Sequence, residues 1–232
     1  MKTKKCKMGP ATRLAIGVLV LEGALQVDTK LIKSRLKAFA AVHRRYLGAQ
    51  GKVETLDEQL REIQAQLAQR NIVQDEAVEA LACALATDGQ PRANPFDAFG
   101  AAAPSLLKKL PFAEEATAID QLVAAVQRSK TVSQATRDAA QAAQKAARAM
   151  EAGLAQAEAV KARLQKSRRR RDAIGESWDK AFAALKRRTR SAADDGGTDL
   201  HPALFGRLVQ SRSKKKKATV TAAPAAPAAS TA

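Results

Sequence analysis

The stretch VETLDEQLREIQAQL, residues 53–67, decides the fold class. Its apolar residues Val53, Leu56, Leu60, Ile63 and Leu67 are three, four, three and four positions apart. This is the heptad spacing of a helix that buries one narrow stripe against another helix. The stretch therefore predicts a coiled-coil-like helix that needs a partner helix elsewhere in the chain.

Two polar residues, Arg70 and Gln74, interrupt this seam. They are expected to set the register of the pairing, or to mark where a third helix or a second chain packs. The apolar face is expected to continue through Ile72, Val73, Ala77, Leu81 and Leu85. Thr87-Asp88-Gly89, with prolines just beyond, predicts the end of the helix.

A second seam follows Pro111 and predicts the partner helix. Its middle is nearly all alanine, which would allow a close approach to the bulkier seam of residues 53–85. A last apolar stripe lies further along the chain, at Ile174, Trp178, Phe182 and Leu185, with Trp178 expected in the core. The members of the second seam are Ile119, Leu122, Val123, Val126, Val132, Ala135, Ala139, Ala142, Ala146, Ala149, Gly153, Ala157, Val160 and Leu164.

The Pro- and Gly-containing segment 88–111 cannot form one continuous helix and predicts the tip of an antiparallel hairpin. A turn there would place residue i opposite about residue 200 − i. Gly48 and Gly51 would then lie level with Gly153, and residues 14–27 would face the Trp178 stripe. Phe96 and Phe99 are expected to cover the helix ends. The fold class is all-α, and two alternatives stay open: a straight hairpin, or one bent into three or four helices with a fresh start at Asp28-Thr29.

Three regions are expected along the chain. Residues 1–10 form a disordered basic N-terminus, residues 11–190 form the helical hairpin or bundle with its tip loop at 87–112, and residues 191–232 form a disordered Lys/Ala/Pro-rich tail that contains a short apolar peptide, 200–209. The start of the chain resembles the charged and apolar regions of a signal peptide. Glu22 interrupts the apolar run, so a buried helix and a cytoplasmic protein are the expectation.

The net charge of +17 is concentrated at the two ends of the sequence. Residues 1–48 carry 11 basic and 2 acidic side chains, residues 49–160 carry 11 and 15, and residues 161–232 carry 18 and 6. Such an excess attracts nucleic acid, acidic proteins or anionic surfaces. Under the hairpin register, residues 30–45 and 161–171 would converge into one cationic patch.

The basic residues of both ends are the candidate binding site. Arg168 to Arg171 fan around a helix, which favours a sequence-independent field over a helix that reads bases. Backbone phosphates of duplex DNA or structured RNA fit best, with the lysine run 214–217 as an auxiliary arm. The candidate residues are Lys30, Lys33, Arg35, Lys37, Arg44, Arg45, Lys161, Arg163, Lys166, Arg168, Arg169, Arg170, Arg171, Lys186, Arg187, Arg188, Arg190, Lys214, Lys215, Lys216 and Lys217.

Catalysis is not expected, nor is any cofactor, metal or small-molecule substrate. His43 and His201 have no evident partner; His43 is expected on a helix surface and His201 in a turn. No metal-binding, nucleophile or phosphate-loop motif appears in the sequence. The competing hypothesis is a scaffold or adaptor subunit that docks through its seam, its basic end or residues 200–209, on an acidic protein or a second copy. A membrane-surface role ranks third, because no bulky exposed apolar face is predicted.

Overall fold

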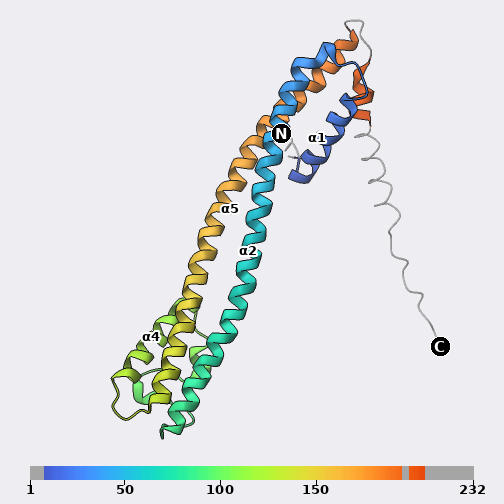
Figure 1. Ribbon diagram of the computed structural model, residues 1–232. Coiled ribbons are helices and arrows are strands. Elements are labelled where there is room, and N and C mark those ends of the chain that lie inside the picture. The colour runs from blue at the N-terminus through green and yellow to red at the C-terminus, as the bar shows by residue number, and fades with distance from the viewer. Residues whose placement is uncertain (1–7, 195–198, 207–232) are drawn as a thin grey trace, which may run out of the picture. The chain divides into compact units, whose positions relative to one another are not determined.

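The computed structural model describes residues 8–194 and 199–206, and within these ranges the chain is helical with no strand. It has two long helices, α2 and α5, accompanied by shorter ones (Figure 1). The fold is thus all-α, as predicted. The elements are α1 (Pro10–Ala24), η1 (Lys30–Ile32), α2 (Lys33–Thr87), η2 (Asp97–Phe99), α3 (Pro104–Leu107), α4 (Phe112–Arg128) and α5 (Gln134–Asp194).

The chain divides into two compact units. Unit 1 comprises residues 1–53 and 167–232, and unit 2 comprises residues 54–166. Helices α2 and α5 each contribute to both units and pair antiparallel in each of them, which confirms the predicted hairpin. The predicted disordered termini at 1–7 and 207–232 lie outside the described residues.

Unit 1 is a bundle in which α1 packs against the start of α2 and the end of α5 (Figure 1). Its centre is aromatic: Phe39, Tyr46 and Trp178 are fully buried. The Trp178 ring stacks on Phe182 and meets Phe39 edge to face, with ring centroids 5.0 and 5.3 Å apart. The predicted core position of Trp178 is confirmed.

Helix α1 reaches the Trp178 stripe as a separate third helix. Its Ile16 and Val20 are buried in the same cluster as Trp178. The chain reverses after Ala24, and the Asp28 carboxylate accepts the backbone N–H of Lys30 at 3.0 Å where the next helix begins. The predicted fresh start at Asp28-Thr29 is therefore the break in the N-terminal arm, whereas α2 runs without interruption through Gly48 and Gly51.

The short apolar peptide is part of the core of unit 1. Residues 200–206 are helical, and Leu200, Leu204 and Phe205 are buried against α1 and α5. Helix α5 itself continues to Asp194. The assignment of residues 191–194 and 200–206 to a disordered tail was wrong: the first group continues α5, and in the second Leu200, Leu204 and Phe205 are buried in the core of unit 1.

Unit 2 is built from the end of α2, the start of α5 and the intervening α4 (Figure 1). Its core contains Leu81, Leu85, Ile119 and Leu122. The tip segment is irregular, as predicted, and Gly89 and Gly100 adopt left-handed backbone conformations there. Phe96 is fully buried and Phe99 packs partly against the same core, which confirms that these aromatics cover the helix ends.

The second predicted seam is divided between two helices. Helix α4 ends at Arg128 and α5 begins at Gln134. The Ser133 hydroxyl accepts the backbone N–H of Thr136, and the Asp88 carboxylate accepts the backbone N–H of Ser133 and the hydroxyl of Thr136 at 2.8 and 2.7 Å. Ser133 is thus a helix N-cap, and α4 is a separate helix joined to α5 by the non-helical residues 129–133.

This extra helix changes the register of the hairpin. Three hydrogen bonds between α5 and the N-terminal arm or α2 give the register. They join His43 to Trp178, Leu31 to Arg188 and Arg70 to Ala149, so the numbers of facing residues add to about 220. The predicted sum of 200 was wrong because the turn lies midway between the end of α2 at 87 and the start of α5 at 134. Gly153 consequently lies against Leu67 and Arg70, not at the level of Gly48 and Gly51.

The polar residues stay in the α2 seam. Gln74 is buried and lies beside Glu115 of α4, which is the third-helix alternative of the sequence analysis. Ile72 and Val73 are about half exposed, so the predicted apolar continuation through them was wrong. The three- and four-residue spacing that begins at Val53 continues without a break, so Arg70 and Gln74 occupy the inward-facing positions instead.

Candidate nucleic-acid interface

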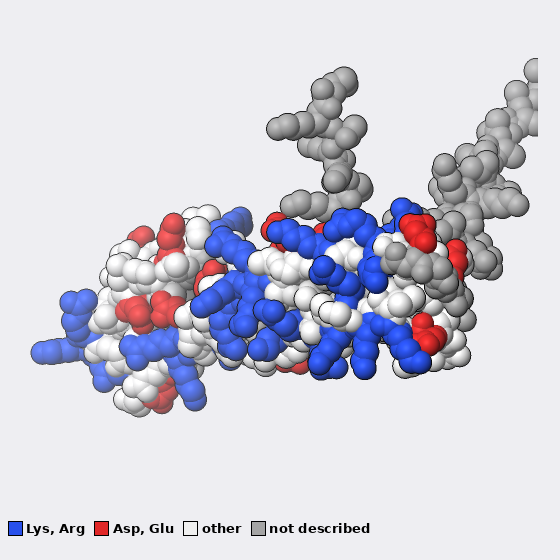
Figure 2. Space-filling view, turned by 90° about the horizontal axis from the view of Figure 1, so that it is seen from above, with Lys and Arg blue, Asp and Glu red and all other residues white. Residues whose placement is uncertain are grey.

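The basic excess belongs to unit 1. Its described residues carry 17 Lys or Arg against 7 Asp or Glu, a net charge of +10. Unit 2 carries 13 basic and 15 acidic residues, a net charge of −2. Figure 2 shows Lys and Arg side chains gathered over the helices, with far fewer carboxylates among them where they are densest. The candidate surface is therefore on unit 1.

The register correction removes part of the predicted patch. Lys161, Arg163 and Lys166 lie in unit 2, and Lys214–Lys217 lie outside the described residues. Arg171 bonds to Gln50, so Arg169 is level with the residues near position 50. Lys33 is therefore about 25 Å from it along the helix axis, at 1.5 Å per residue. The predicted meeting of residues 30–45 with residues 161–171 was wrong.

A different basic stretch takes its place. The hydrogen bond from Arg188 Nε to the carbonyl of Leu31 sets the end of α5 beside the start of α2. Residues 30–45 of the N-terminal arm therefore face residues 175–190. The cations of this stretch of α5 are Lys180, Lys186, Arg187, Arg188 and Arg190, so the two basic runs still lie side by side in unit 1.

One arm of this surface has no acidic residue at all. Between Lys30 and Val53 the sequence holds seven Lys or Arg and no Asp or Glu. Among the described residues, no ion pair involves the exposed Lys33, Arg35, Lys37, Arg44 or Arg45 of that arm. Uncompensated like charges along a helix repel one another, so bound anions would stabilise this arm.

The second arm holds part of its charge in fixed positions. Arg171 is held by Asp172 at 2.9 Å and by Gln50 at 3.2 Å. Arg188 donates to Leu31 and, at 3.2 Å, to the Ser191 hydroxyl. Such anchored guanidinium groups lose less side-chain entropy when they bind a ligand.

A buried polar group that sequence reasoning missed secures α1. Arg13 is almost fully buried and donates two hydrogen bonds to the Asp179 carboxylate, at 2.8 and 3.0 Å. This carboxylate bond raises the pKa of Arg13, against the opposing effect of burial. The only sequence signal is a lone basic residue in a mainly apolar helix, which does not identify its partner.

His43 belongs to the same interior, so its predicted surface position was wrong. It is 5% exposed, and its Nδ1 accepts the indole N–H of Trp178 at 3.1 Å. Its ring lies so close to Gly17 of α1 that a Cβ there would overlap it. Burial lowers the pKa of His43, which keeps the ring neutral and able to accept this hydrogen bond.

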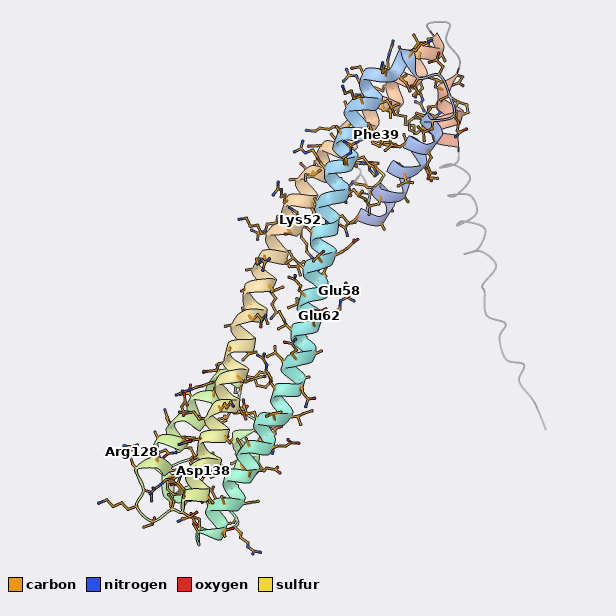
Figure 3. All side chains as sticks on the ribbon, viewed as in Figure 1. Phe39, Lys52, Glu58, Glu62, Arg128 and Asp138 are labelled. Carbon is orange, nitrogen blue, oxygen red and sulfur yellow. The ribbon has the colours of Figure 1, made fainter. Side chains whose placement is uncertain are left out.

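No aromatic platform accompanies the cations. Phe39, Tyr46, Trp178 and Phe205 are buried and Phe182 is partly buried; these are all the aromatic residues in the described part of unit 1 (Figure 3 labels Phe39). Single-stranded nucleic acid is commonly held by bases stacked on exposed aromatics. The surface offers charge without stacking.

The carboxylates of unit 2 give it a different surface. Glu58 and Glu62 project from α2 on the part of that helix that belongs to unit 2, where Arg128 and Asp138 mark α4 and α5 (Figure 3). Its buried carboxyl, Glu115, has a raised pKa because burial disfavours the charged form. Unit 2 therefore serves as an internal reference for charge-based experiments.

Other kinds of site are sparse. Within residues 8–194 and 199–206, no three His, Cys, Asp or Glu side chains are grouped so as to hold a metal ion. None of the helices in these ranges combines the length and apolarity needed to cross a bilayer. A shallow pocket of about 410 Å³ in unit 2 is lined mainly by alanine and proline, with Cys83 and Arg92 at its edge.

Comparisons of the chain with protein-family models, with curated proteins and with solved structures find no match.

Proposed function

We propose that this protein is a non-enzymatic helical protein that binds polyanions, with nucleic-acid backbone as the ligand, through the basic surface of unit 1. One observation carries the proposal: the two units share the helices α2 and α5, yet unit 1 has a net charge of +10 and unit 2 of −2. Solubility alone would be served by a smaller charge spread over both units. A concentrated charge favours a polyanionic partner.

Phosphate contacts explain the composition of the surface. Lys and Arg bind phosphate oxygens through charge and N–H donors and carry no sequence information in those contacts. The cations occupy several sides of two helices, so they suit the extended charge of a backbone better than one compact anion. The interaction is expected to be sequence-independent and strongly dependent on salt.

The test is a binding isotherm with mixed-sequence nucleic acid at several salt concentrations, followed by fluorescence anisotropy. About six phosphate contacts would give a slope of log K against log salt near −5, at about 0.9 for each contact. The variant Arg44→Gln/Arg45→Gln/Arg169→Gln/Arg170→Gln should flatten the slope. A matched unit 2 variant, replacing the exposed Arg61, Arg92, Arg128 and Lys145 with Gln, should leave it unchanged.

The alternative is a scaffold or adaptor that docks on an acidic protein or a second copy. Residues 200–206, one of its expected docking elements, are packed into unit 1. The exposed pair Ile72 and Val73 on α2 is the feature that favours it. A defined oligomer in sedimentation that persists at high salt, together with no nucleic-acid binding at low salt, would replace the leading proposal with this one.

A further inference from the structure

We infer that the basic surface of unit 1 binds double-stranded nucleic acid through one defined side of the α2–α5 pair, the side opposite α1. We call this side the open face, made by residues 31–52, which span the end of η1 and the start of α2, and by residues 170–191 of α5. The inference rests on the proposed function and assigns its face and its ligand class. Three observations define the open face: what covers the other side, which cations it carries, and where the carboxylates lie.

Helix α1 covers one side of the pair. It meets α2 where Gly17 lies against His43, and it meets α5 where Arg13 packs on Gly175 and bonds to Asp179. Lys186 of α5 lies over the Phe205 ring, so the segment 200–206 is on that side too. The side away from these contacts is marked by the hydrogen bond from Arg188 to the Leu31 carbonyl.

Helical periodicity identifies the rest of the open face. On α2, steps of four and three residues from Leu31 give one stripe, and on α5 the same steps from Arg170 give another that ends at Arg188 and Ser191. Arg170 and Arg188 are eighteen residues apart, which is five full turns, so they project in the same direction. The stripes consist of Leu31, Arg35, Ala38, Val42, Arg45, Ala49 and Lys52 on α2, and of Arg170, Ile174, Ser177, Ala181, Ala184, Arg188 and Ser191 on α5.

These fourteen residues include five cations and no carboxylate. Along α2 no acidic residue exists between Lys30 and Val53. Along α5 the carboxylates Asp172, Glu176 and Asp179 follow one another at four and three residues, and Asp179 bonds to Arg13 of α1. That acidic stripe therefore lies on the side of α5 that is turned toward α1, where Asp172 and Glu176 remain exposed. Segregation of this kind keeps carboxylates off both stripes, which favours a positive potential on the open face.

The cations of the open face lie in two groups. Arg35 and Arg188 lie near one level, while Arg45, Lys52 and Arg170 lie about 15–25 Å further along the axis, at 1.5 Å per residue. Small or aliphatic residues occupy the interval, among them Ser177, Ala181 and Ala184. A phosphate backbone can approach such a low-relief strip closely while the longer Arg and Lys side chains reach its oxygens.

The breadth of the face selects the ligand. One helix is about 10 Å wide and two packed helices present about 20 Å, whereas the major groove is about 12 Å wide. The pair therefore lies across the outside of a duplex, and its two cation groups contact the backbones that border a groove. The absence of exposed aromatics among the described residues of unit 1 removes the stacking on which single-strand binders rely. Duplex is thus favoured over single strand.

The experiment compares arginines on the open face with arginines of the same two helices that point elsewhere. The open-face variant is Arg35→Gln/Arg45→Gln/Arg170→Gln, and the control is Arg44→Gln/Arg169→Gln/Arg187→Gln. Both remove three exposed arginines from the same two helices and change the charge equally. Titration of a 25-base-pair mixed-sequence duplex DNA should show a salt slope smaller by about 2.7 for the open-face variant. The control should reduce the slope much less, because its arginines add to the general positive field of unit 1 but lie off the open face. Wild type should bind this duplex about tenfold more tightly than one of its strands.

Folding and rescue are checked with the same protein. Replacing Arg35, Arg45 and Arg170 with Lys keeps the charge and should restore the slope, which separates loss of contact from loss of structure. Equal effects of the two Gln variants would overturn the open face and leave the proposed function standing. Equal affinity for duplex and single strand would overturn the ligand class. No salt-dependent binding by wild type would instead overturn the proposed function itself.

Discussion

Replacing Gly17 with alanine tests the packing of α1, because a methyl group there would overlap the imidazole of His43. That ring cannot move aside easily: it is buried, stacked near Phe39 and bonded to Trp178. We expect Gly17→Ala to destabilise unit 1 even though alanine is the better helix former.

The size of the effect follows from three contributions. Overpacking a filled interior costs about 1–3 kcal/mol. Loss of the hydrogen bond between His43 and Trp178 removes about 1 kcal/mol, and alanine at a helix interior returns about 1 kcal/mol. The expected net loss is about 2 kcal/mol in the free energy of unfolding. Gly48 is the matched control: it is also helical, nothing lies within 4 Å of its Cβ position, and Gly48→Ala should stabilise by about 0.5–1 kcal/mol.

Urea unfolding followed by tryptophan emission measures both variants, since Trp178 is the sole tryptophan and lies in the core of unit 1. Gly17→Ala should lower the urea midpoint and change the emission of the folded protein, while Gly48→Ala should raise the midpoint and leave the emission unchanged. If Gly17→Ala were stabilising by the same amount as Gly48→Ala, the close approach of α1 to His43 would be refuted.

Three further predictions concern titratable groups. Burial raises the pKa of Glu115, so the protonated carboxyl stabilises the fold below about pH 4.5, and this contribution is lost as the pH rises through the raised pKa of the folded state. Glu115→Gln should therefore stabilise unit 2 by about 1 kcal/mol at pH 7 and by less at pH 5. Amide exchange in α4 measures the difference. Hydrogen bonds from Ser133 and Thr136 lower the pKa of Asp88, so Asp88→Ala should reduce the melting temperature at neutral pH. This difference from wild type should vanish as the pH falls through the lowered pKa of Asp88. An equal difference at all pH values would contradict a role for the charged Asp88 carboxylate in binding Ser133 and Thr136. Burial lowers the pKa of His43, so unit 1 should lose stability as the pH falls below about 6.5, and His43→Phe should weaken this dependence in urea titrations at pH 5 and 7.

Local patterns predicted the helices and part of their buried faces, but the alanine seam of α5 was partly wrong, because Ala135, Ala142 and Ala149 are exposed while Ala140 and Ala143 are buried. The 3-4 spacing from Val53 to Leu67 identified an α2 seam in which Val53, Leu56 and Ile63 are buried. The stripe through Trp178 and Leu185 identified the buried face of α5, and the run of prolines after Thr87 identified the irregular tip. These features depend on neighbours within two turns of the chain, which periodicity records directly.

Periodicity could not predict which distant residues contact one another across the helices. The apolar steps of α4 continue in nearly the same phase into α5, so the break at Ser133 went unnoticed and the register was displaced by about twenty residues. The segment RSKTVSQATRD, 128–138, did hold a signal, since a serine directly before a helical stretch is a common N-cap. The burial of Arg13 and of His43 depends on residues more than 130 positions away, and nothing near either residue indicates it.

The sequence located the basic runs, but the pairing it predicted between them was wrong. Composition located the cations, and those of residues 30–45 do face a basic stretch. Which stretch they face depended on the register, and which side of the helices stays uncovered depended on where α1 and residues 200–206 pack. Both are tertiary properties that charge counts do not contain.

Unit 2 is one uninterrupted length of chain inserted between the two halves of unit 1. During synthesis, residues 54–166 emerge together and can fold while the ribosome is still translating. By then the acid-free segment of α2 has left the ribosomal tunnel, but Trp178, Leu185 and Leu204 have not yet been synthesised. These are residues against which α1 and that segment pack in the folded protein. This arrangement gives the nascent protein a period in which the acid-free segment of α2 is exposed and unpaired, and completion of unit 1 waits until residues 167–206 have been synthesised.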